Sequence, residues 1–517
     1  MTKYTAQQVF SIVSKNKLTE EQSAAISDAS TDGPSLVIAG AGSGKTELMA
    51  VRTLFLVANG LAKPSEILGL TFTRKAASEL SNRVNKGLVE LRESSFWPEG
   101  LAEDFEPPKI TTYNSFGNEI FRTLSLQVGF EADATLLTEA GAIALAKDIV
   151  TGATAEDFAE LLNWDRTLDY LTEKVLSASA ALTDNRQAPE TAINYLRNFQ
   201  ERIAGLPKTD KGEAGTFAYH QAVIDTVRSS SLVFELANKY QEEKRIRGLV
   251  DFSDQVALAF TALEKQELVL PHRFVLLDEY QDTSSIQTML LAKLFRGRAV
   301  MAVGDPNQAI YGWRGASSAN LSGYSNDFGK AEQFALSASW RSGQKIVDAA
   351  NLVSEPLSSD VGLTPVRLTA GLAIESSVQA LVCQDEVSEA KAAAEWLESR
   401  MSEDTSGAIL FRSKQAMSVF TEALAARGLD FEVSGLSGLL EQPEVIDLIA
   451  ALKVISDPES GAELMRILAG PKFRIAPRDI AKLQSFAKKL SRMRKEVNGQ
   501  LPMTLVETLD ELRNPKT

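Results

Sequence analysis

The stretch "SLVIAGAGSGKTE" at residues 35–47 constrains the fold most, because an apolar run meets a glycine-rich turn and then a helical pattern. The apolar run predicts a buried strand, and the residues from Lys45 onward predict a helix. Alternating glycines let backbone N–H groups turn inward around an anion, and the next helix offers its positive N-terminus. The pattern therefore predicts a phosphate-binding loop. The alternative is a glycine-rich turn that binds nothing.

The spacing of this stretch is that of loops that bind nucleotide phosphates, with Ala39 where the first glycine usually stands. Lys45 is expected to reach the β and γ phosphates, and Thr46 is expected to bind Mg²⁺. ATP and Mg²⁺ are the ligands that follow. The expected nucleotide-binding residues of the loop are Ala39, Gly40, Ala41, Gly42, Ser43, Gly44, Lys45 and Thr46.

A second apolar run, "FVLLDE" at residues 274–279, ends abruptly in two carboxylates. A strand that simply emerges into solvent would also explain such a pair. Given a phosphate-binding loop, however, Mg-nucleotide hydrolysis requires one carboxylate for the metal and one that takes a proton from water. We therefore expect Asp278 to bind the metal and Glu279 to act as the general base. Both should lie at the C-terminal edge of a parallel sheet.

Strand patterns alternate with helical patterns early in the chain, which indicates an α/β domain with a parallel sheet. The middle of the chain is rich in Ala, Leu and Glu at helical spacing and predicts an inserted helical domain. Strands are expected at 35–40, 66–73, 109–113, 273–279 and 299–305, and in a second α/β unit at 376–383 and 407–413. The expected domains are 1–127 with 237–347, 128–236, 348–445 and 446–517.

Composition bounds the class of protein. A chain of 517 residues exceeds the usual limit of one core, so several domains are expected. A single cysteine, Cys383, and a polar start without a signal-peptide pattern favour the cytoplasm, and no apolar run is long enough to span a membrane. The formal net charge of −14 argues against indiscriminate nucleic-acid binding, so any site for a polyanion has to be local.

Several segments resemble, in order, the motifs of superfamily one DNA helicases of the UvrD/Rep group. The resemblance implies a P-loop RecA-like motor domain with a parallel sheet and a helical insertion, a partial second RecA-like domain, and a helical second insertion. It also implies ATP-driven unwinding of DNA, travelling 3′ to 5′, in repair or recombination. The segments are "LTEEQSAAI", "GLTFTRKAASEL", "TTYNSF", "LLDEYQDTSSIQ", "VGDPNQAIYGWRGA", "SWRSGQKIVDAAN", "AILFRS" and "GLDFEVSGLSGLLEQPEVIDLIAAL".

The resemblance also implies roles at the nucleotide. Gln22 matches a glutamine that grips the adenine edge, although an exposed helix glutamine is the alternative. Trp340 matches an aromatic residue that stacks on adenine. Gln308 matches a residue that senses the γ-phosphate and couples it to the DNA, and Arg341 matches an arginine that stabilises charge on the transferred phosphoryl group.

Single-stranded and duplex DNA are the implied partners. Aromatic rings stack on bases of any sequence, and polar or cationic groups hold phosphates, so such a surface grips DNA without sequence preference. For Trp313 a place in the core is the alternative. The residues that match the DNA-facing motifs are Phe72, Thr73, Thr111, Asn114, Tyr311, Trp313 and Arg314.

The sequence also departs from the family pattern. Glu47 stands where many relatives have an arginine that helps to hold the nucleotide. Two late family motifs have no match, which predicts that the chain is the N-terminal portion of a longer polypeptide. The stretch 44–80 further resembles helicase-nuclease subunits of the AdnB, RecB and AddA kind, which work with a partner subunit. The alternative function is a nucleotide-dependent DNA-binding module that unwinds little by itself.

Overall fold

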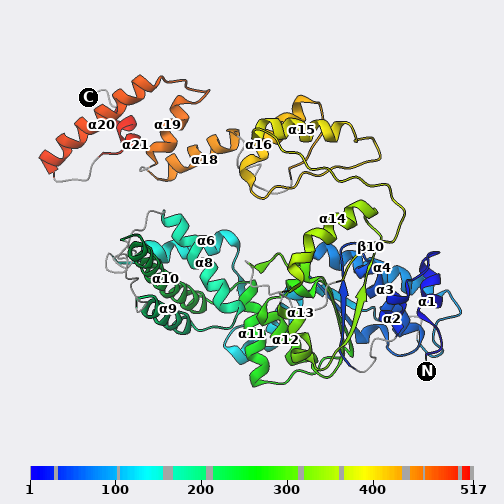
Figure 1. Ribbon diagram of the computed structural model, residues 1–517. Coiled ribbons are helices and arrows are strands. Elements are labelled where there is room, and N and C mark those ends of the chain that lie inside the picture. Colours follow the sequence, from blue (N-terminus) through cyan, green and yellow to red (C-terminus); the bar gives the residue numbers. More distant parts are fainter. Residues whose placement is uncertain are drawn as a thin grey trace. The chain divides into compact units, whose positions relative to one another are not determined.

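The computed structural model describes residues 2–27, 33–101, 105–154, 167–204, 214–312, 319–359, 366–433, 443–457, 460–498 and 503–512. The chain divides into two compact units, Met1–Val378 and Gln379–Thr517. Their elements are labelled along the chain in Figure 1. No helix within the described ranges has the length and apolar character needed to cross a membrane.

The first unit is built on a six-stranded sheet in the order β3-β2-β6-β7-β1-β8. Every neighbouring pair of strands is parallel, so all the C-terminal strand ends meet at one edge, where open α/β sheets bind ligands. The predicted α/β class with a parallel sheet is confirmed. The strands are β1 (Ser35–Ala39), β2 (Ile67–Thr71), β3 (Lys109–Thr112), β6 (Phe274–Leu277), β7 (Ala299–Gly304) and β8 (Glu332–Leu336).

Helices cover both faces of this sheet, because side chains along each strand alternate between two cores. Val37 of β1 enters the core beneath the first four helices, whereas its neighbour Leu36 enters the opposite core. The first face is covered by α1 (Ala6–Val13), α2 (Glu20–Ser27), α3 (Lys45–Ala58) and α4 (Arg74–Arg92). The second is covered by α5 (Tyr113–Leu124), α11 (Phe252–Lys265), α12 (Ser285–Phe295) and α13 (Ala319–Phe328).

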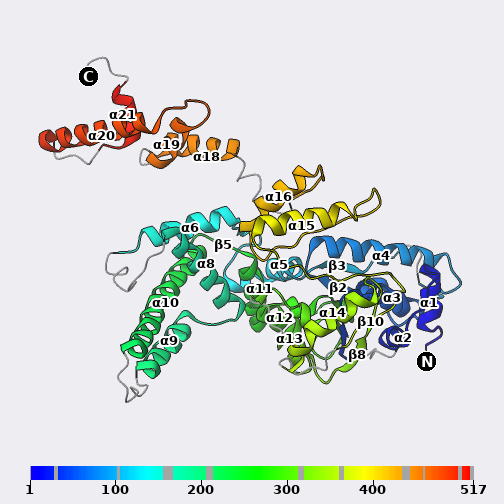
Figure 2. The same cartoon turned by 45° about the horizontal axis from the view of Figure 1, so that its top comes forward.

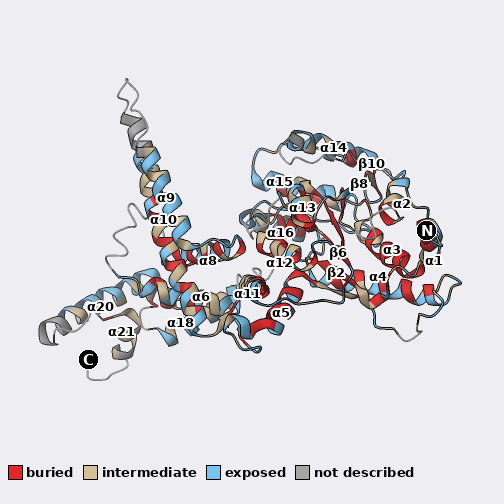
Figure 3. Cartoon of the chain, turned by 90° about the horizontal axis from the view of Figure 1, so that it is seen from below, coloured by how far each residue is buried: buried red, intermediate tan, exposed pale blue. Residues whose placement is uncertain are grey.

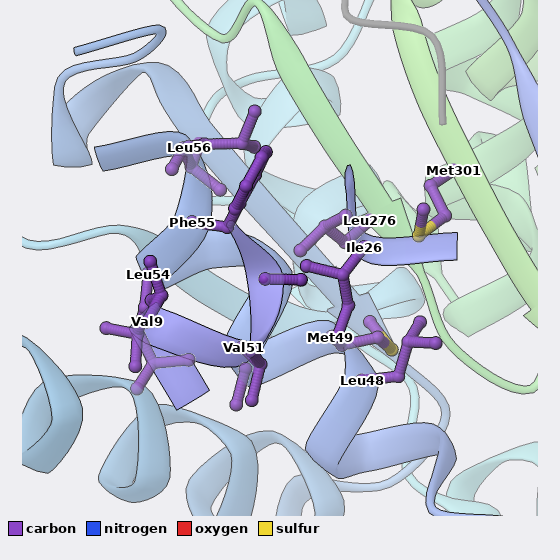
Figure 4. Packing of buried hydrophobic residues seen from close by; sticks show 14 of the residues in the cluster. Val9, Ile26, Leu48, Met49, Val51, Leu54, Phe55, Leu56, Leu276 and Met301 are labelled. Atoms are coloured by element: carbon purple, nitrogen blue, oxygen red, sulfur yellow. The ribbon is translucent and has the colours of Figure 1, made fainter. Parts of the chain in front are cut away.

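Helix α3 is the anchor of the phosphate-binding loop, and every residue from Leu48 to Ala58 is buried. Phe55, Leu54 and Met49 pack with residues of α1, α2 and the sheet (Figure 4). Burying each large apolar side chain stabilises the fold by roughly 1.5–3 kcal/mol. The start of α3, which carries the loop, is therefore held rigidly against β1.

The insertion between α5 and α11 contains four helices within the described residues, packed around an apolar core of their own. In two views α9 lies alongside α10 (Figures 1 and 2). Near the return to the sheet domain, buried Lys244 contacts Asp251 at 2.6 Å and Asp254 at 2.7 Å. The helices are α6 (Glu139–Thr151), α8 (Leu168–Asp184), α9 (Pro189–Ala204) and α10 (Ala214–Ile246), and β4 (Thr135–Leu136) pairs with β5 (Leu249–Val250) where the insertion begins and ends.

The chain after β8 continues on the first unit through a short parallel pair, β9 (Ala338–Ser339) with β10 (Thr369–Ala370). Helix α14 (Gln344–Ser354) lies between these strands in sequence. Six short 3-10 helices complete the described elements: η1 (Pro64–Glu66), η2 (Ser125–Val128), η3 (Tyr280–Asp282), η4 (Pro306–Gln308), η6 (Glu355–Ser359) and η7 (Lys414–Ala416).

The second unit is helical where it is described. The segments 376–383 and 407–413, which were expected to be strands, have no regular secondary structure and pair with no other described strand. Val382 and Leu410 are 100% and 93% exposed as a result. In the first unit, by contrast, buried residues gather along the strands (Figure 3). The helices are α15 (Glu386–Glu398), α16 (Met417–Ala426), α18 (Pro443–Ser456), α19 (Gly461–Ala469), α20 (Pro477–Asn498) and α21 (Leu505–Leu512).

Asp184, the last residue of α8, yields a test of the inserted helices. Burial raises its pKa to about 6, and the charges of Asp251 and Asp254 act in the same direction. Because the pKa is higher in the folded state than in the unfolded chain, the charged form destabilises the fold above about pH 6, and this cost disappears below about pH 4. Asp184→Asn should therefore raise the free energy of unfolding at pH 7.5 by on the order of 1–3 kcal/mol, and by much less at pH 4.

Urea denaturation at the two pH values measures this difference. Asp148→Asn is the matched control, because Asp148 is exposed on α6 and its replacement should change stability by less than about 0.5 kcal/mol at either pH. An equal effect of Asp184→Asn at both pH values would show that its charge is not what destabilises this region.

Candidate nucleotide and DNA site

The loop after β1 has the backbone that a phosphate-binding loop needs. Gly42 and Gly44 have φ values of 74° and 88°, in the left-handed region that glycine adopts without strain. Ser43 is buried, and its hydroxyl donates to the carbonyl oxygen of Gly40 at 2.8 Å. Gly44 caps α3, so the loop ends at a helix N-terminus, where free N–H groups favour an anion.

Lys45 and Glu279 form an ion pair across the sheet edge. Lys45 Nζ lies 3.0 Å from Glu279 Oε2, with the two side chains 11% and 32% exposed. Lys45 follows β1 and Glu279 follows β6, and the two residues are 234 positions apart in the chain. Glu279 has a φ of 47°, a left-handed backbone that costs a residue with a side chain roughly 1 kcal/mol or more. The fold thus holds this carboxylate against the lysine in a strained conformation.

Asp278, next to this pair, is almost fully buried, with 4% exposure. Burial and the neighbouring Glu279 raise its pKa to about 7, while Lys45 and the N–H of Glu279 act in the opposite direction. A cation beside the carboxylate would favour its ionised form. Mg²⁺ is commonly bound by one or two protein oxygens together with substrate phosphates, and the Asp278 carboxylate and the Thr46 hydroxyl are donors of that kind.

Gln22 is not an exposed helix glutamine, because only 8% of it is accessible. Its Oε1 accepts from the N–H of Thr19 at 3.1 Å, at the start of α2. Its Nε2 donates to the carbonyl oxygen of Ser43 at 3.2 Å, within the phosphate-binding loop. The amide is therefore fixed beside the loop.

The segment after β8 closes over the same loop. The N–H of Trp340 donates to the carbonyl oxygen of Gly42 at 2.8 Å, and the Ser339 hydroxyl donates to that of Ala41 at 2.9 Å. Arg341 is exposed, yet a Cβ on Gly42 would lie only 2.5 Å from its Cβ. The indole of Trp340 is 37% exposed beside the loop. Trp340 and Arg341 thus lie next to the residues predicted to hold phosphates.

Gln308 belongs to the loop that follows β7, and β7 is the strand between β1 and β6 in the sheet. Its Nε2 donates to Asp305 Oδ2 at 2.7 Å. Asp305 is linked in turn to Gln281, whose Oε1 accepts from the Asp305 N–H at 3.0 Å. Gln281 lies two residues after Glu279 in the same motif but was not predicted as a site residue. Nothing in the sequence shows that a glutamine in this turn is only 1% exposed.

Comparison with known proteins agrees with this arrangement. Residues 18–329 match the UvrD/REP helicase N-terminal domain, and residues 334–508 match the UvrD-like helicase C-terminal domain. The chain belongs to the UvrD/Rep helicase family. The first match includes the phosphate-binding loop, the Asp278-Glu279 pair and Gln308, and the second includes Trp340 and Arg341.

Among curated members of the UvrD/Rep family, the chain is 27% identical over 489 residues to the ATP-dependent DNA helicase Rep of Escherichia coli K12, covering 92% of this chain and 64% of that protein. It is 26% identical over 484 residues to the ATP-dependent DNA helicase PcrA of Staphylococcus epidermidis RP62A, and the match covers 91% of this chain and 58% of that protein. The PcrA of Staphylococcus aureus Mu50 is 26% identical over 486 residues, with the same coverage. The chain thus spans less than two thirds of the length of these relatives.

The residues predicted to face DNA follow β2, β3 and β7. The rings of Phe72 and Tyr311 stack on one another, with centroids 4.9 Å apart and planes 28° apart. Exposed Asn114 accepts from Gln287 Nε2 at 2.8 Å. The Thr73 hydroxyl caps α4 by accepting from the N–H of Ala76 at 3.1 Å. The structure thus brings Phe72 and Tyr311 together from two loops.

Three other predicted positions complete this picture. Thr111 is half-buried on β3, where it is paired in register with Leu70 of β2. Trp313 and Arg314 lie outside the described residues.

Glu47 stands where many relatives have an arginine that helps to hold the nucleotide. Its Oε2 contacts Arg83 Nη1 of α4 at 2.5 Å, so a guanidinium group does lie beside Glu47.

The loop geometry predicts that Gly42→Ala weakens nucleotide binding. An added Cβ would meet Arg341 and would strain a residue whose φ is 74°. Gly60→Ala is the matched control, because Gly60 has a φ of 65° but nothing within 4 Å of an added Cβ. The positive φ should cost each variant roughly 1 kcal/mol, and the clash with Arg341 adds to this cost only in Gly42→Ala. Only Gly42→Ala should raise the Kd for a fluorescent ATP analogue, by about tenfold or more. Equal Kd values for the two variants would contradict the role of the loop.

Proposed function

We propose that this chain is an ATP-dependent DNA helicase or translocase of the UvrD type. The contact of Lys45 Nζ with Glu279 Oε2 at 3.0 Å carries the proposal. It brings the phosphate-binding loop and the acid pair within reach of one phosphate group. A 3′-to-5′ direction, a role in repair or recombination and a cytoplasmic location belong to the proposal and rest on the resemblance and the composition alone.

Hydrolysis follows from the roles of these side chains. Lys45 binds the β and γ phosphates of ATP, and Thr46 and Asp278 are the residues that would hold Mg²⁺, which would neutralise charge on the phosphates. The phosphates compete with Glu279 for Lys45, so binding of ATP frees the carboxylate. Glu279 then accepts a proton from the water that attacks the γ-phosphorus.

The remaining nucleotide contacts come from both sides of the loop. Gln22 reads the adenine edge, since an amide both donates and accepts, and Trp340 stacks on the base. Arg341 stabilises the negative charge of the transferred phosphoryl group, and Gln308 responds to the γ-phosphate. The expected backbone contacts extend from Ala39 to Gly44, where N–H groups turn toward the phosphates.

Single-stranded DNA follows the C-terminal ends of β2, β3 and β7 in this proposal. Phe72 and Tyr311 supply aromatic faces for bases, and Thr73, Thr111 and Asn114 supply polar groups for the backbone. Trp313 and Arg314 extend the same surface. The domain boundaries drawn from the sequence and the helicase-nuclease branch with its partner subunit also stay proposals.

A second candidate is a nucleotide-dependent DNA-binding module that unwinds little. The observation that favours it is in the second unit, where the segments 379–383 and 407–413 pair with no strand among the described residues. A motor needs a second α/β domain that closes on the nucleotide. Unwinding of a tailed duplex, measured beside ATP hydrolysis, separates the candidates: DNA-stimulated hydrolysis without strand separation would favour the module.

The main test separates the two proposed roles, phosphate binding by Lys45 and proton acceptance by Glu279. Lys45→Ala should raise the Kd for Mg-ATP by about tenfold or more, because the phosphates lose their cationic partner. Glu279→Gln should keep ATP binding but lower DNA-stimulated hydrolysis by about 100-fold or more, because an amide accepts no proton. Binding of a fluorescent ATP analogue and steady-state phosphate release measure the two effects. Normal turnover by Glu279→Gln would refute the assignment of the base.

A further inference from the structure

Gln281 is a buried amide in the turn η3, between β6 and α12. It is 1% exposed, and both ends of its amide make hydrogen bonds within the site. A buried amide without partners would cost about 1–3 kcal/mol, so a glutamine at this depth is tied to its two partners. Those partners belong to two different strand ends.

One end of the amide holds the carboxylate that was assigned as the base. Gln281 Nε2 donates to Glu279 Oε2 at 2.8 Å, and the same oxygen contacts Lys45 at 3.0 Å. If the phosphates of ATP draw Lys45 away, the hydrogen bond from Gln281 is the remaining contact that the described residues show for that oxygen. The amide then fixes the orientation of the carboxylate.

The other end of the amide holds the loop after β7. Gln281 Oε1 accepts from the N–H of Asp305 at 3.0 Å. This approach depends on Gly304, because a Cβ there would lie 2.6 Å from the same Oε1. Asp305 in turn accepts from Gln308 Nε2 through its side chain and from the Gln308 N–H through its carbonyl oxygen.

A continuous path therefore leads from Glu279 through Gln281 and Asp305 to Gln308. The same loop continues for three residues to Tyr311, whose ring stacks on Phe72 at the surface assigned to DNA. Coupling between two sites requires contacts that differ between two arrangements, and Gln281 joins two loops whose relative movement would change its hydrogen bonds.

We propose that Gln281 is a positioning residue that couples the orientation of the Glu279 carboxylate to the DNA-facing loop 304–311. DNA bound against Tyr311 moves this loop, and Gln281 transmits the movement to the carboxylate, so hydrolysis accelerates when DNA is in place. This inference rests on the proposed function, since it assumes that Glu279 is the base and that DNA stimulates hydrolysis.

The test compares two variants of Gln281 in the full chain. Gln281→Met keeps the length of the side chain but makes neither hydrogen bond. Gln281→Glu keeps an oxygen that accepts from Asp305 but loses the donor to Glu279. In both, the ratio of kcat with oligo(dT) to kcat without DNA should fall about tenfold, while KM for ATP should change by less than about twofold in Gln281→Met, which adds no charge beside Lys45. A merely structural role would not separate these two quantities.

Gln255→Met is the matched control, because Gln255 is equally buried, at 2% exposure, on α11. It should leave the stimulation ratio unchanged. An unchanged ratio in Gln281→Met, or an equal fall in Gln255→Met, would overturn the coupling role. Absence of DNA stimulation in the unaltered chain would instead refute the proposed function, so the two failures are distinguishable.

Discussion

The ion pair between Lys45 and Glu279 is the contact on which the rest of the site depends. It exists only because β1 and β6 run parallel with β7 between them, so that residues from distant parts of the chain meet at one sheet edge. Rigid packing of α3 fixes one partner, and a strained backbone at residue 279 fixes the other. In the proposed mechanism, Glu279 cannot act as a base until phosphates take its place beside Lys45.

The sequence was a reliable guide where strands are buried on both faces. All residues of β1, β2, β6 and β7 are buried, and their apolar runs were predicted as strands within a few residues. Strand β8 was not predicted, because it lies at the edge of the sheet and only Leu336 of its five residues is buried. Edge strands tolerate polar residues, which remove the apolar signal.

The sequence pointed to residues of the candidate site where chemistry dictates the residue type, but not where geometry decides. A lysine after three glycines, taken together with a pair of carboxylates after an apolar run, indicates phosphate chemistry, so Lys45 and Glu279 could be named from sequence. Gln281 could not be identified from the sequence, because its place in the site depends on its burial and on its close approach to Gly304. The expected strands near Val382 and Leu410 have strand-like composition, but a strand needs a partner for its backbone hydrogen bonds.

The most direct test of this account is a structure of the protein with Mg²⁺ and a non-hydrolysable ATP analogue. The quantity to measure is the distance from Lys45 Nζ to Glu279 Oε2, which is 3.0 Å in the structure described above. The account predicts that it lengthens beyond about 4 Å, the limit of an ion pair, while Lys45 Nζ comes within hydrogen-bonding distance of a phosphate oxygen. An analogue bound with the ion pair still closed would contradict it.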